Sequence, residues 1–361
     1  MTTATGTERL NNFGTLRLLF AGLVVVSHSP ELIDGDRLRE PLTRLFGTLS
    51  LGEVAVDGFF LISGYLIAKS FRNSRSVLDY LAKRILRIYP GFIAASLVSI
   101  VLVAPLVGGE LTQVSPTTML ARIGLLSRPV VPGVFGGLPY PDLNGAMWTV
   151  AYEFRCYLVM IFLAPILFSS NRSAQVIALA ALAVLYIFRS QVPDVPVGRA
   201  VFGQSTEMIR FCFIFVIGSA FYVWRLRVSY TARGALLAAS ILVVTLFIAP
   251  VAEPAVAILG GYLIFWYAFA CPVNRISQWM ESVDPSYGLY LYAWPIQNLL
   301  IFNVAGITPL VVTAVTLPMA LTLGVISWYL IEKPAQQYKR LLARPMRVGS
   351  DNSEMKPMDN L

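Results

Sequence analysis

The only histidine of this chain, His28, lies near the end of an apolar segment, eleven residues after Arg17. In an α-helix, eleven residues bring the chain back to within about 20° of its starting direction and raise it by about 16 Å. The imidazole and the guanidinium are therefore predicted to project from one face of one helix. Ionisable groups in an apolar helix are costly and usually functional. Because an imidazole can accept a proton or an acyl group, His28 and Arg17 are the first candidates for catalysis.

Two carboxylates, Asp57 and Glu153, also lie in apolar segments. A carboxylate in such a place must find a partner or stay protonated. Asp57 is interpreted either as a residue at a wet end of a packing helix or as a group that orients or charges a neighbour. Glu153 is interpreted either as part of an interhelical salt bridge or as the acceptor that fixes the tautomer of His28 and raises its basicity. The second interpretation makes both residues candidates for catalysis.

A basic cluster containing Lys83, Arg84 and Arg87 stands where a loop enters the third apolar segment. Such a cluster commonly sets membrane topology or binds lipid headgroups. Arg84 and Arg87 are three residues apart and share a helix face, and planar guanidinium groups suit phosphate recognition. The cluster is therefore also a candidate binding site for a nucleotide-bearing acyl donor on the cytoplasmic side.

Aromatic and hydroxyl side chains accompany these charges along the chain. They form either belts at the membrane interfaces or the wall of a cavity for sugar or acyl groups, and the sequence does not choose between them. The residues that we expect to contact substrate are Ser63, Tyr65, Trp148, Tyr157 and Tyr287.

The composition predicts a membrane protein. Hydrophobic residues make up 56% of the chain and charged residues 13%, which is about half the charge of a soluble domain. Only helices and closed barrels span a bilayer, and the apolar runs are longer than barrel strands. The predicted fold class is therefore an all-α polytopic helical bundle. The net charge of +8 fits lysine and arginine in cytoplasmic loops better than nucleic-acid binding.

The three cysteines give no sign of a metal or redox site. Cys156, Cys212 and Cys271 lie within or at the edges of apolar runs, without metal-type or redox-type spacing. Together with a single histidine, this spacing leads us to expect no metal site.

Apolar runs separated by Pro, Gly and charge clusters predict about ten transmembrane helices. With the N-terminus in the cytoplasm, the loops and tails on that side contain 18 lysines and arginines and the opposite side contains 8. This distribution favours ten spans with both termini cytoplasmic. The predicted spans are 13–29, 52–70, 86–107, 146–168, 174–189, 207–224, 233–250, 255–271, 286–304 and 309–331.

Two further segments have distinct compositions. Residues 108–144 form the longest predicted non-spanning stretch and are rich in Pro and Gly, which favours an external cap or a re-entrant piece over the site. Residues 344–361 are polar and are predicted to be a disordered cytoplasmic tail. The remaining residues, 1–343, form one predicted transmembrane domain.

Five segments, taken in order, resemble the acyltransferase-3 family of integral membrane acyltransferases. They are similar to its Arg-x10-His, Asp-x-Phe-Phe-x-x-Ser-Gly-Tyr, Arg-Arg-x-x-Arg-x-x-Pro, Trp-x-x-x-x-Glu-x-x-x-Tyr and Glu-Lys-Pro motifs. Two positions depart from the family, since Gly14 stands where many members have Asp and Lys83 replaces an Arg. In this chain the matching segments are Asn11 to Ser29, Asp57 to Ile67, Lys83 to Pro90, Trp148 to Tyr157 and Glu332-Lys333-Pro334.

The resemblance implies an enzyme of the bacterial inner membrane that moves acyl groups, usually acetyl, from cytoplasmic acyl-CoA to cell-envelope or secreted glycans. Acyl-CoA would be a co-substrate, with no tightly bound cofactor, and the other partners would be a glycan or lipid-linked glycan acceptor and membrane lipids. His28 and Arg17 would be the essential pair, followed by Arg84 and Arg87. We expect His28 to carry the acyl group or to act as general base. The alternative left open is an exporter or flippase of an envelope saccharide or lipid-linked precursor, without acyl chemistry.

Overall fold

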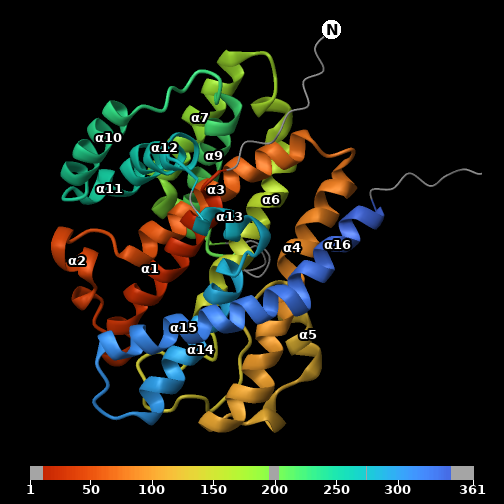
Figure 1. The fold of residues 1–361 in the computed structure, drawn as a ribbon, viewed down its shortest axis with the longest axis vertical. Helices are drawn as coiled ribbons and strands as arrows, with labels where there is room; N and C mark the ends of the chain where they lie inside the picture. The colour runs from red at the N-terminus through yellow and green to blue at the C-terminus, as the bar shows by residue number, and fades with distance from the viewer. Residues whose placement is uncertain (1–10, 195–202, 274, 343–361) are drawn as a thin grey trace, which may run out of the picture.

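The computed structural model describes residues 11–194, 203–273 and 275–342. Within these ranges the chain is a bundle of helices without strands (Figure 1). The all-α fold of a multi-pass membrane protein is therefore confirmed. The predicted tail, residues 344–361, lies outside the described residues.

Long helices separated by short loops and short helices make up the bundle. Three of them continue through a π-helical turn, at residues 99–103, 256–260 and 328–332. The helices are α1 (Phe13–Asp34), α2 (Pro41–Phe46), α3 (Leu51–Arg72), α4 (Val77–Val98), α5 (Pro116–Gly124), α6 (Trp148–Leu167), α7 (Arg172–Ile187), α9 (Ser205–Val223), α10 (Ala232–Thr245), α11 (Ala249–Ala255), α12 (Gly261–Ala270), α13 (Arg275–Ser282), α14 (Ser286–Asn303), α15 (Pro309–Ser327) and α16 (Lys333–Leu342).

Every predicted span falls on one of these helices. By length and apolarity, seven helical stretches in the described residues are suited to crossing a membrane. The predicted spans 174–189 and 233–250 correspond to the shorter apolar helices α7 and α10. Helix α14, which is interrupted by polar residues, is not one of the seven. The count of ten therefore stays a prediction.

Two helix boundaries differ from the prediction in ways that affect the site. Helix α1 does not end at residue 29 but continues through Pro30 to Asp34, where Gly35 in the left-handed conformation terminates it. Helix α4 begins at Val77 instead of residue 86, because the hydroxyl of Ser76 caps its first turn by accepting from the Asp79 amide. The basic cluster thus lies inside a helix and not at its entrance.

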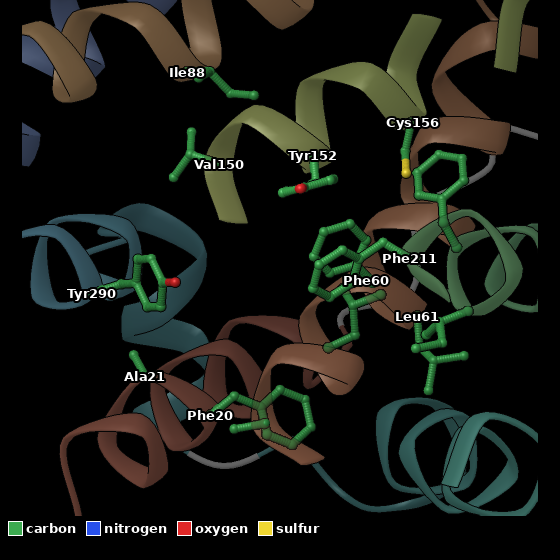
Figure 2. Packing of buried hydrophobic residues seen from close by; sticks show 14 of the residues in the cluster. Phe20, Ala21, Phe60, Leu61, Ile88, Val150, Tyr152, Cys156, Phe211 and Tyr290 are labelled. Carbon is green, nitrogen blue, oxygen red and sulfur yellow. The ribbon is translucent and has the colours of Figure 1, made fainter. Parts of the chain in front are cut away.

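Helix α3 lies at the centre of the bundle and packs tightly on α9. A side chain at Gly64 would meet the backbone oxygen of Phe215, and one at Gly218 would meet that of Leu61. The glycines therefore allow the two backbones to approach closely, as small residues do in membrane bundles. Next to this contact, the rings of Phe60 and Phe211 stack at 4.2 Å between centroids (Figure 2).

The segment before α6 is tied to α14 by hydrogen bonds. The Trp294 indole donates to the carbonyl of Asp142 at 3.1 Å, and the Tyr290 hydroxyl donates to that of Ala146 at 2.7 Å. Gly145 fits under the indole, where a side chain would collide with it. These contacts hold the end of the predicted cap against one side of the helix that carries Tyr290 and Trp294.

Candidate active site

A cavity of about 860 Å³, counted with its open mouth, lies between α1, α3, α4, α6 and α14. Its wall combines an apolar surface with charged and hydroxyl groups, as expected for a ligand site. Seven of the predicted residues line it, namely Arg17, Ser63, Arg84, Arg87, Glu153, Tyr157 and Tyr287.

Three guanidinium groups gather at one end of this cavity, and a single carboxylate joins two of them. Asp284 Oδ2 lies 2.7 Å from Arg87 Nη2 and 3.2 Å from Arg17 Nη2, while Oδ1 accepts from the Ser286 hydroxyl at 2.6 Å. Burial alone would raise the pKa of Asp284, but Arg17 and Arg87 lower it to about 2. Asp284 is therefore ionised at physiological pH and holds both arginines in place.

Arg87 has further contacts that position it. Its Nη1 lies 3.6 Å from the buried carboxylate of Glu332, which also accepts from the Ser327 hydroxyl. Its guanidinium lies 5.8 Å from the ring centre of Tyr287, whose hydroxyl donates to the backbone of α4. Arg87 of α4 is thus held in place by contacts with Asp284 and Tyr287, at the start of α14, and with Glu332, in the turn that follows α15.

Arg84 differs from the other two arginines because no carboxylate in the described part of the chain pairs with it. Its Nη2 donates to the Ser70 hydroxyl at 3.2 Å, and its guanidinium lies 5.9 Å from the ring centre of Tyr157. Its Nε has no hydrogen-bond partner there. The charge of Arg84 is therefore the one most available to an anionic ligand.

Glu153 lies on the cavity wall but does not contact His28. Its carboxylate accepts from the Ser63 hydroxyl at 2.7 Å and from the Tyr157 hydroxyl. The prediction that Glu153 orients the imidazole was therefore wrong. Because Tyr157 is one helical turn after Glu153 on α6, the tyrosine reaches that carboxylate within the same helix.

The carboxylate beside His28 is Glu31, one turn further along α1. Glu31 Oε2 lies 3.6 Å from His28 Nδ1, and its other oxygen accepts from the Tyr140 hydroxyl at 3.0 Å. Burial and this hydrogen bond raise the pKa of Tyr140. The rings of His28 and Trp294 also pack edge to face, with 5.1 Å between their centroids.

His28 lies beyond the end of the cavity and not on its wall. Tyr290 lines the cavity, and Trp294, which touches His28, follows one turn later on α14. The four residues from Tyr290 to Trp294 correspond to a rise of about 6 Å. The structure therefore brings Arg17, Arg84, Arg87 and Glu153 together and places His28 about one turn further along.

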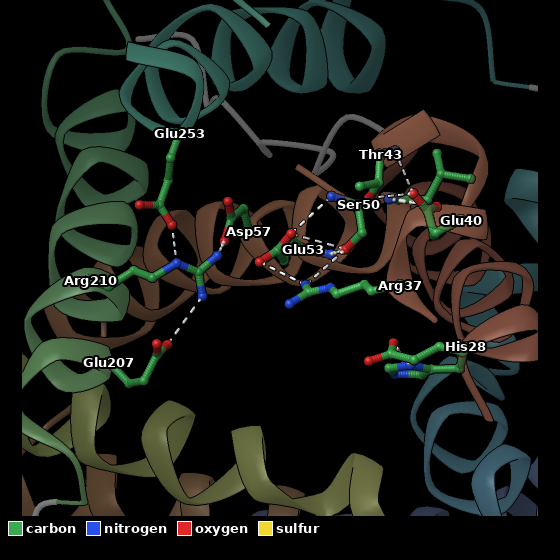
Figure 3. Close-up of polar contacts among 12 residues, drawn as sticks. His28, Arg37, Glu40, Thr43, Ser50, Glu53, Asp57, Glu207, Arg210 and Glu253 are labelled. Atoms are coloured by element: carbon green, nitrogen blue, oxygen red, sulfur yellow. Dashed lines mark hydrogen bonds and ion pairs between the residues drawn. The ribbon is translucent and has the colours of Figure 1, made fainter. Parts of the chain in front are cut away.

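Asp57 belongs to a different cluster, centred on Arg210 of α9 (Figure 3). Its side chain is 0% exposed, and Oδ1 accepts from Arg210 Nη2 at 2.6 Å. Arg210 also pairs with Glu253 and lies 3.5 Å from Glu207. Asp57 neither lines the cavity nor contacts His28, and the neighbour that it orients is Arg210. The carboxylate is used to join α3 to α9.

Three other predicted residues also lie away from the cavity. Lys83 pairs with Asp79 at 2.6 Å, one turn earlier on α4. Tyr65 is buried among aromatic rings that include Phe13 and Phe265. Trp148 is 41% exposed, and its ring packs on Tyr152. The expectation that these residues bind donor or substrate is therefore not met by their positions.

Several residues of the site had no predicted role. The spacing of Glu31, three residues after His28, would have revealed it if α1 had been extended past residue 29. Asp284 lies in a loop and is distant in sequence from both arginines that it joins, so no local pattern indicates it. The cavity also includes Thr149 and Tyr290, and Glu332 lies against Arg87. Within the described residues, no group of three or more His, Cys, Asp or Glu side chains could hold a metal ion.

Comparison with known proteins assigns this architecture to a family. The acyltransferase domain family model matches residues 10–329, which is most of the chain. The chain belongs to this family. An O-acetyl transferase of Shigella phage Sf6 is 28% identical over 343 residues, covering 90% of this chain and 96% of the phage protein.

A second member is similar over nearly its whole length. Nodulation protein 10 of Rhizobium leguminosarum bv. viciae is 30% identical over 370 residues, covering 94% of this chain and 97% of that protein. No solved structure matches the chain. Membership identifies a membrane acyltransferase, and it decides against the exporter without acyl chemistry.

Proposed function

We propose that this acyltransferase takes an acyl group from acyl-CoA, which enters from the cytoplasm, and transfers it to a hydroxyl of a cell-envelope or secreted glycan at the bacterial inner membrane. The observation that carries the proposal is the cavity with Arg17, Arg84 and Arg87 gathered at one end. Guanidinium groups bind phosphates through paired, charge-assisted hydrogen bonds. The phosphates of CoA would contact this end, with Arg84 as the most available cation.

The arrangement of the cavity suggests where the thioester would lie. The apolar wall formed by Val56, Phe59 and Val150 would accept the pantetheine arm and the acyl group. Tyr290 stands at the far end of this wall, one turn before Trp294. The acyl group would therefore have to advance about 6 Å along α14 to reach His28.

His28 would act through Nε2, because Nδ1 faces Glu31. As general base, Nε2 takes the proton of the acceptor hydroxyl while the hydroxyl oxygen attacks the thioester carbonyl. The carbon–sulfur bond then breaks, and the CoA thiolate takes the proton from the imidazolium. As acyl carrier, Nε2 itself attacks the thioester carbonyl, and the carbon–sulfur bond breaks to release the CoA thiolate. In a second step the glycan hydroxyl attacks the acyl-imidazole, the carbon–nitrogen bond breaks, and the hydroxyl proton passes through the released Nε2 to the CoA thiolate. In both cases Glu31 would favour the tautomer with its proton on Nδ1 and stabilise the imidazolium.

Relatives support the choice of acyl group and acceptor atom. The Shigella phage protein is named as an O-acetyl transferase, so we propose acetyl as the acyl group and a hydroxyl oxygen as the acceptor.

The test uses the purified full-length protein in proteoliposomes loaded with acetyl-CoA labelled in the acetyl group, with a membrane glycan extract as acceptor. We expect the wild-type protein to release CoA and label the glycan. His28→Ala should abolish labelling while the protein keeps its thermal stability. Labelling of the glycan by His28→Ala at the wild-type rate would exclude both roles proposed for the imidazole. Glycan movement without CoA release would exclude the acyltransferase reaction altogether.

A further inference from the structure

Helices α6, α7 and α9 enclose a second cavity that shares no lining residue with the first. It measures about 900 Å³, counted with its open side, and the side chains that line it are hydrophobic. We refer to it as the α6–α7–α9 groove. Its position behind α6, away from Glu153 and Tyr157, separates it from the site described above.

The dimensions of the groove match one leaflet of a bilayer. Its lining runs from Val159 to Leu167 on α6 and from Met208 to Val216 on α9. Eight residues of helix rise about 12 Å, and half of a hydrocarbon core measures about 15 Å. The groove can therefore hold most of one acyl chain lying along the helices.

A buried amide lies next to one end of the groove, bonded to the lining residue Leu167. The Gln175 side chain donates to the carbonyl of Leu167 at 3.0 Å and accepts from the Trp224 indole at 3.0 Å. These bonds tie the ends of α6 and α9 to the first turn of α7. The polar headgroup of a lipid in the groove would therefore lie at the opposite end.

Arg155 lies at that opposite end. It is one turn before Val159 on the same face of α6, and its guanidinium stacks on Tyr152 at 4.9 Å. The Nη1 atom lies 2.7 Å from the position that a side chain at Gly203, just before α9, would occupy. The guanidinium is thus held at the level where α9 begins, next to the groove.

Arg155 forms no ion pair in the part of the chain that the structure describes. No carboxylate there forms an ion pair with it, and residues 195–202 contain neither Asp nor Glu. By contrast, Arg210 on the neighbouring α9 has three carboxylates around it. An unpaired cation in a membrane-spanning helix is costly unless a ligand supplies the anion.

We propose that the α6–α7–α9 groove binds a membrane phospholipid with an anionic headgroup, whose phosphate contacts Arg155 and one of whose acyl chains fills the groove. A phosphate next to the guanidinium would form the charge-assisted bonds that the protein does not provide. The apolar lining would pack on the chain without leaving a polar group unsatisfied. This lipid site does not depend on acyl transfer, so the two proposals can fail separately.

Native mass spectrometry of the full-length protein in detergent tests the proposal, with phosphatidylglycerol and phosphatidylcholine of identical chains as probes. We expect the wild-type protein to retain phosphatidylglycerol about tenfold better, because the trimethylammonium group of phosphatidylcholine offsets the charge of its phosphate next to the guanidinium and weakens the charge-assisted contact. Arg155→Gln should lose this preference and Arg155→Lys should keep most of it. Leu182→Trp, which fills the groove and leaves the charge, should retain neither lipid.

Arg225→Gln is the matched control. Arg225 stacks on Tyr222, three residues before it, at 4.3 Å, just as Arg155 does on Tyr152, but it follows Trp224 at the end of the groove where Gln175 lies. Its variant should bind lipid like the wild type. If the Leu182→Trp variant retained phosphatidylglycerol, the lipid would not bind in the groove. If inorganic phosphate bound to the protein as well as phosphatidylglycerol does, the proposal that an acyl chain fills the groove would be overturned.

Discussion

At the scale of single residues, the three arginines of the cavity differ in whether a carboxylate pairs with them. Arg17 and Arg87 share Asp284, which neutralises part of their charge and fixes their direction. Arg84 contacts only a hydroxyl and an aromatic ring among the described residues. The arginine without an acidic partner should therefore lose the most donor affinity when it is removed.

We predict that Arg84→Ala raises the KM for acetyl-CoA about tenfold or more, because it removes a charge-assisted contact to phosphate. The KM for acetyl-pantetheine, which has no phosphate, should stay unchanged. Steady-state kinetics with both donors measure the difference. Lys83→Ala is the control, since Lys83 is adjacent, equally charged and paired with Asp79 away from the cavity. An equal rise in KM for the two donors would mean that Arg84 does not bind phosphate.

The two carboxylates Glu31 and Glu153 should have different kinetic roles. Glu31→Gln is predicted to lower kcat about 100-fold with little change in the KM for donor, because it removes the group that orients and charges His28. Glu153→Gln should act mainly on the KM, because Glu153 lies on the cavity wall with Ser63 and Tyr157. Measurement of kcat and KM for both variants tests these two roles. A larger loss of kcat in Glu153→Gln would contradict the assignment of Glu31 to His28.

At the scale of helices, α3 determines how the site is assembled. One of its faces carries Ser63 to the cavity, and the other packs on α9 through glycines and through the ion pair of Asp57 with Arg210. Removing one partner of a buried ion pair leaves an uncompensated charge. This physical reason explains why an acidic residue in apolar sequence can be structural and not catalytic.

The close contact of α3 with α9 leads to a stability prediction. Gly64→Ala places a methyl group on the backbone oxygen of Phe215, which cannot move without shifting α9. We expect a loss of about 3 kcal/mol in the free energy of unfolding. Gly22→Ala is the matched control in α1, because its methyl group would make only ordinary contact with Leu317 at 3.8 Å. Thermal unfolding in detergent compares the two, and equal stability would show that the helices can separate at no cost.

At the scale of the whole molecule, the basic residues and the helices together predict the orientation in the membrane. If both termini are cytoplasmic, the turn between α3 and α4 faces the cytoplasm and α5 faces the opposite side. This orientation places the end of the cavity at Arg84 and Arg87 on the side where acyl-CoA is present. It also places His28, near the other end of α1, closer to the outside.

Cysteine labelling in intact cells tests this topology. In a background with Cys271→Ser, a membrane-impermeant maleimide should label Thr118→Cys in α5 and should not label Asn73→Cys after α3. Both positions are exposed in the structure, so both should react once the cells are permeabilised. Labelling of Asn73→Cys in intact cells would reverse the orientation and place the basic end of the cavity on the wrong side for acyl-CoA.

Most of the architecture could be predicted because it depends on local properties of the chain. The length of an apolar run is sufficient to indicate a helix in a membrane, and the order of five short motifs indicated the acyltransferase family that the comparison confirmed. The spacing of Arg84 and Arg87 likewise placed both on one face. Helix ends were predicted less well, since capping by Ser76 and continuation through Pro30 are not visible in hydropathy.

By itself, the sequence determined that this protein is a helical membrane acyltransferase with a basic cluster and a single imidazole. Only the tertiary structure decided which charge meets which: Glu31 with His28, Arg210 with Asp57, and Asp284 with both Arg17 and Arg87. Hydrophobicity and helical spacing are properties of neighbouring residues. Most of these pairs join residues far apart in the chain, so they depend on how each helix is rotated and shifted against the next.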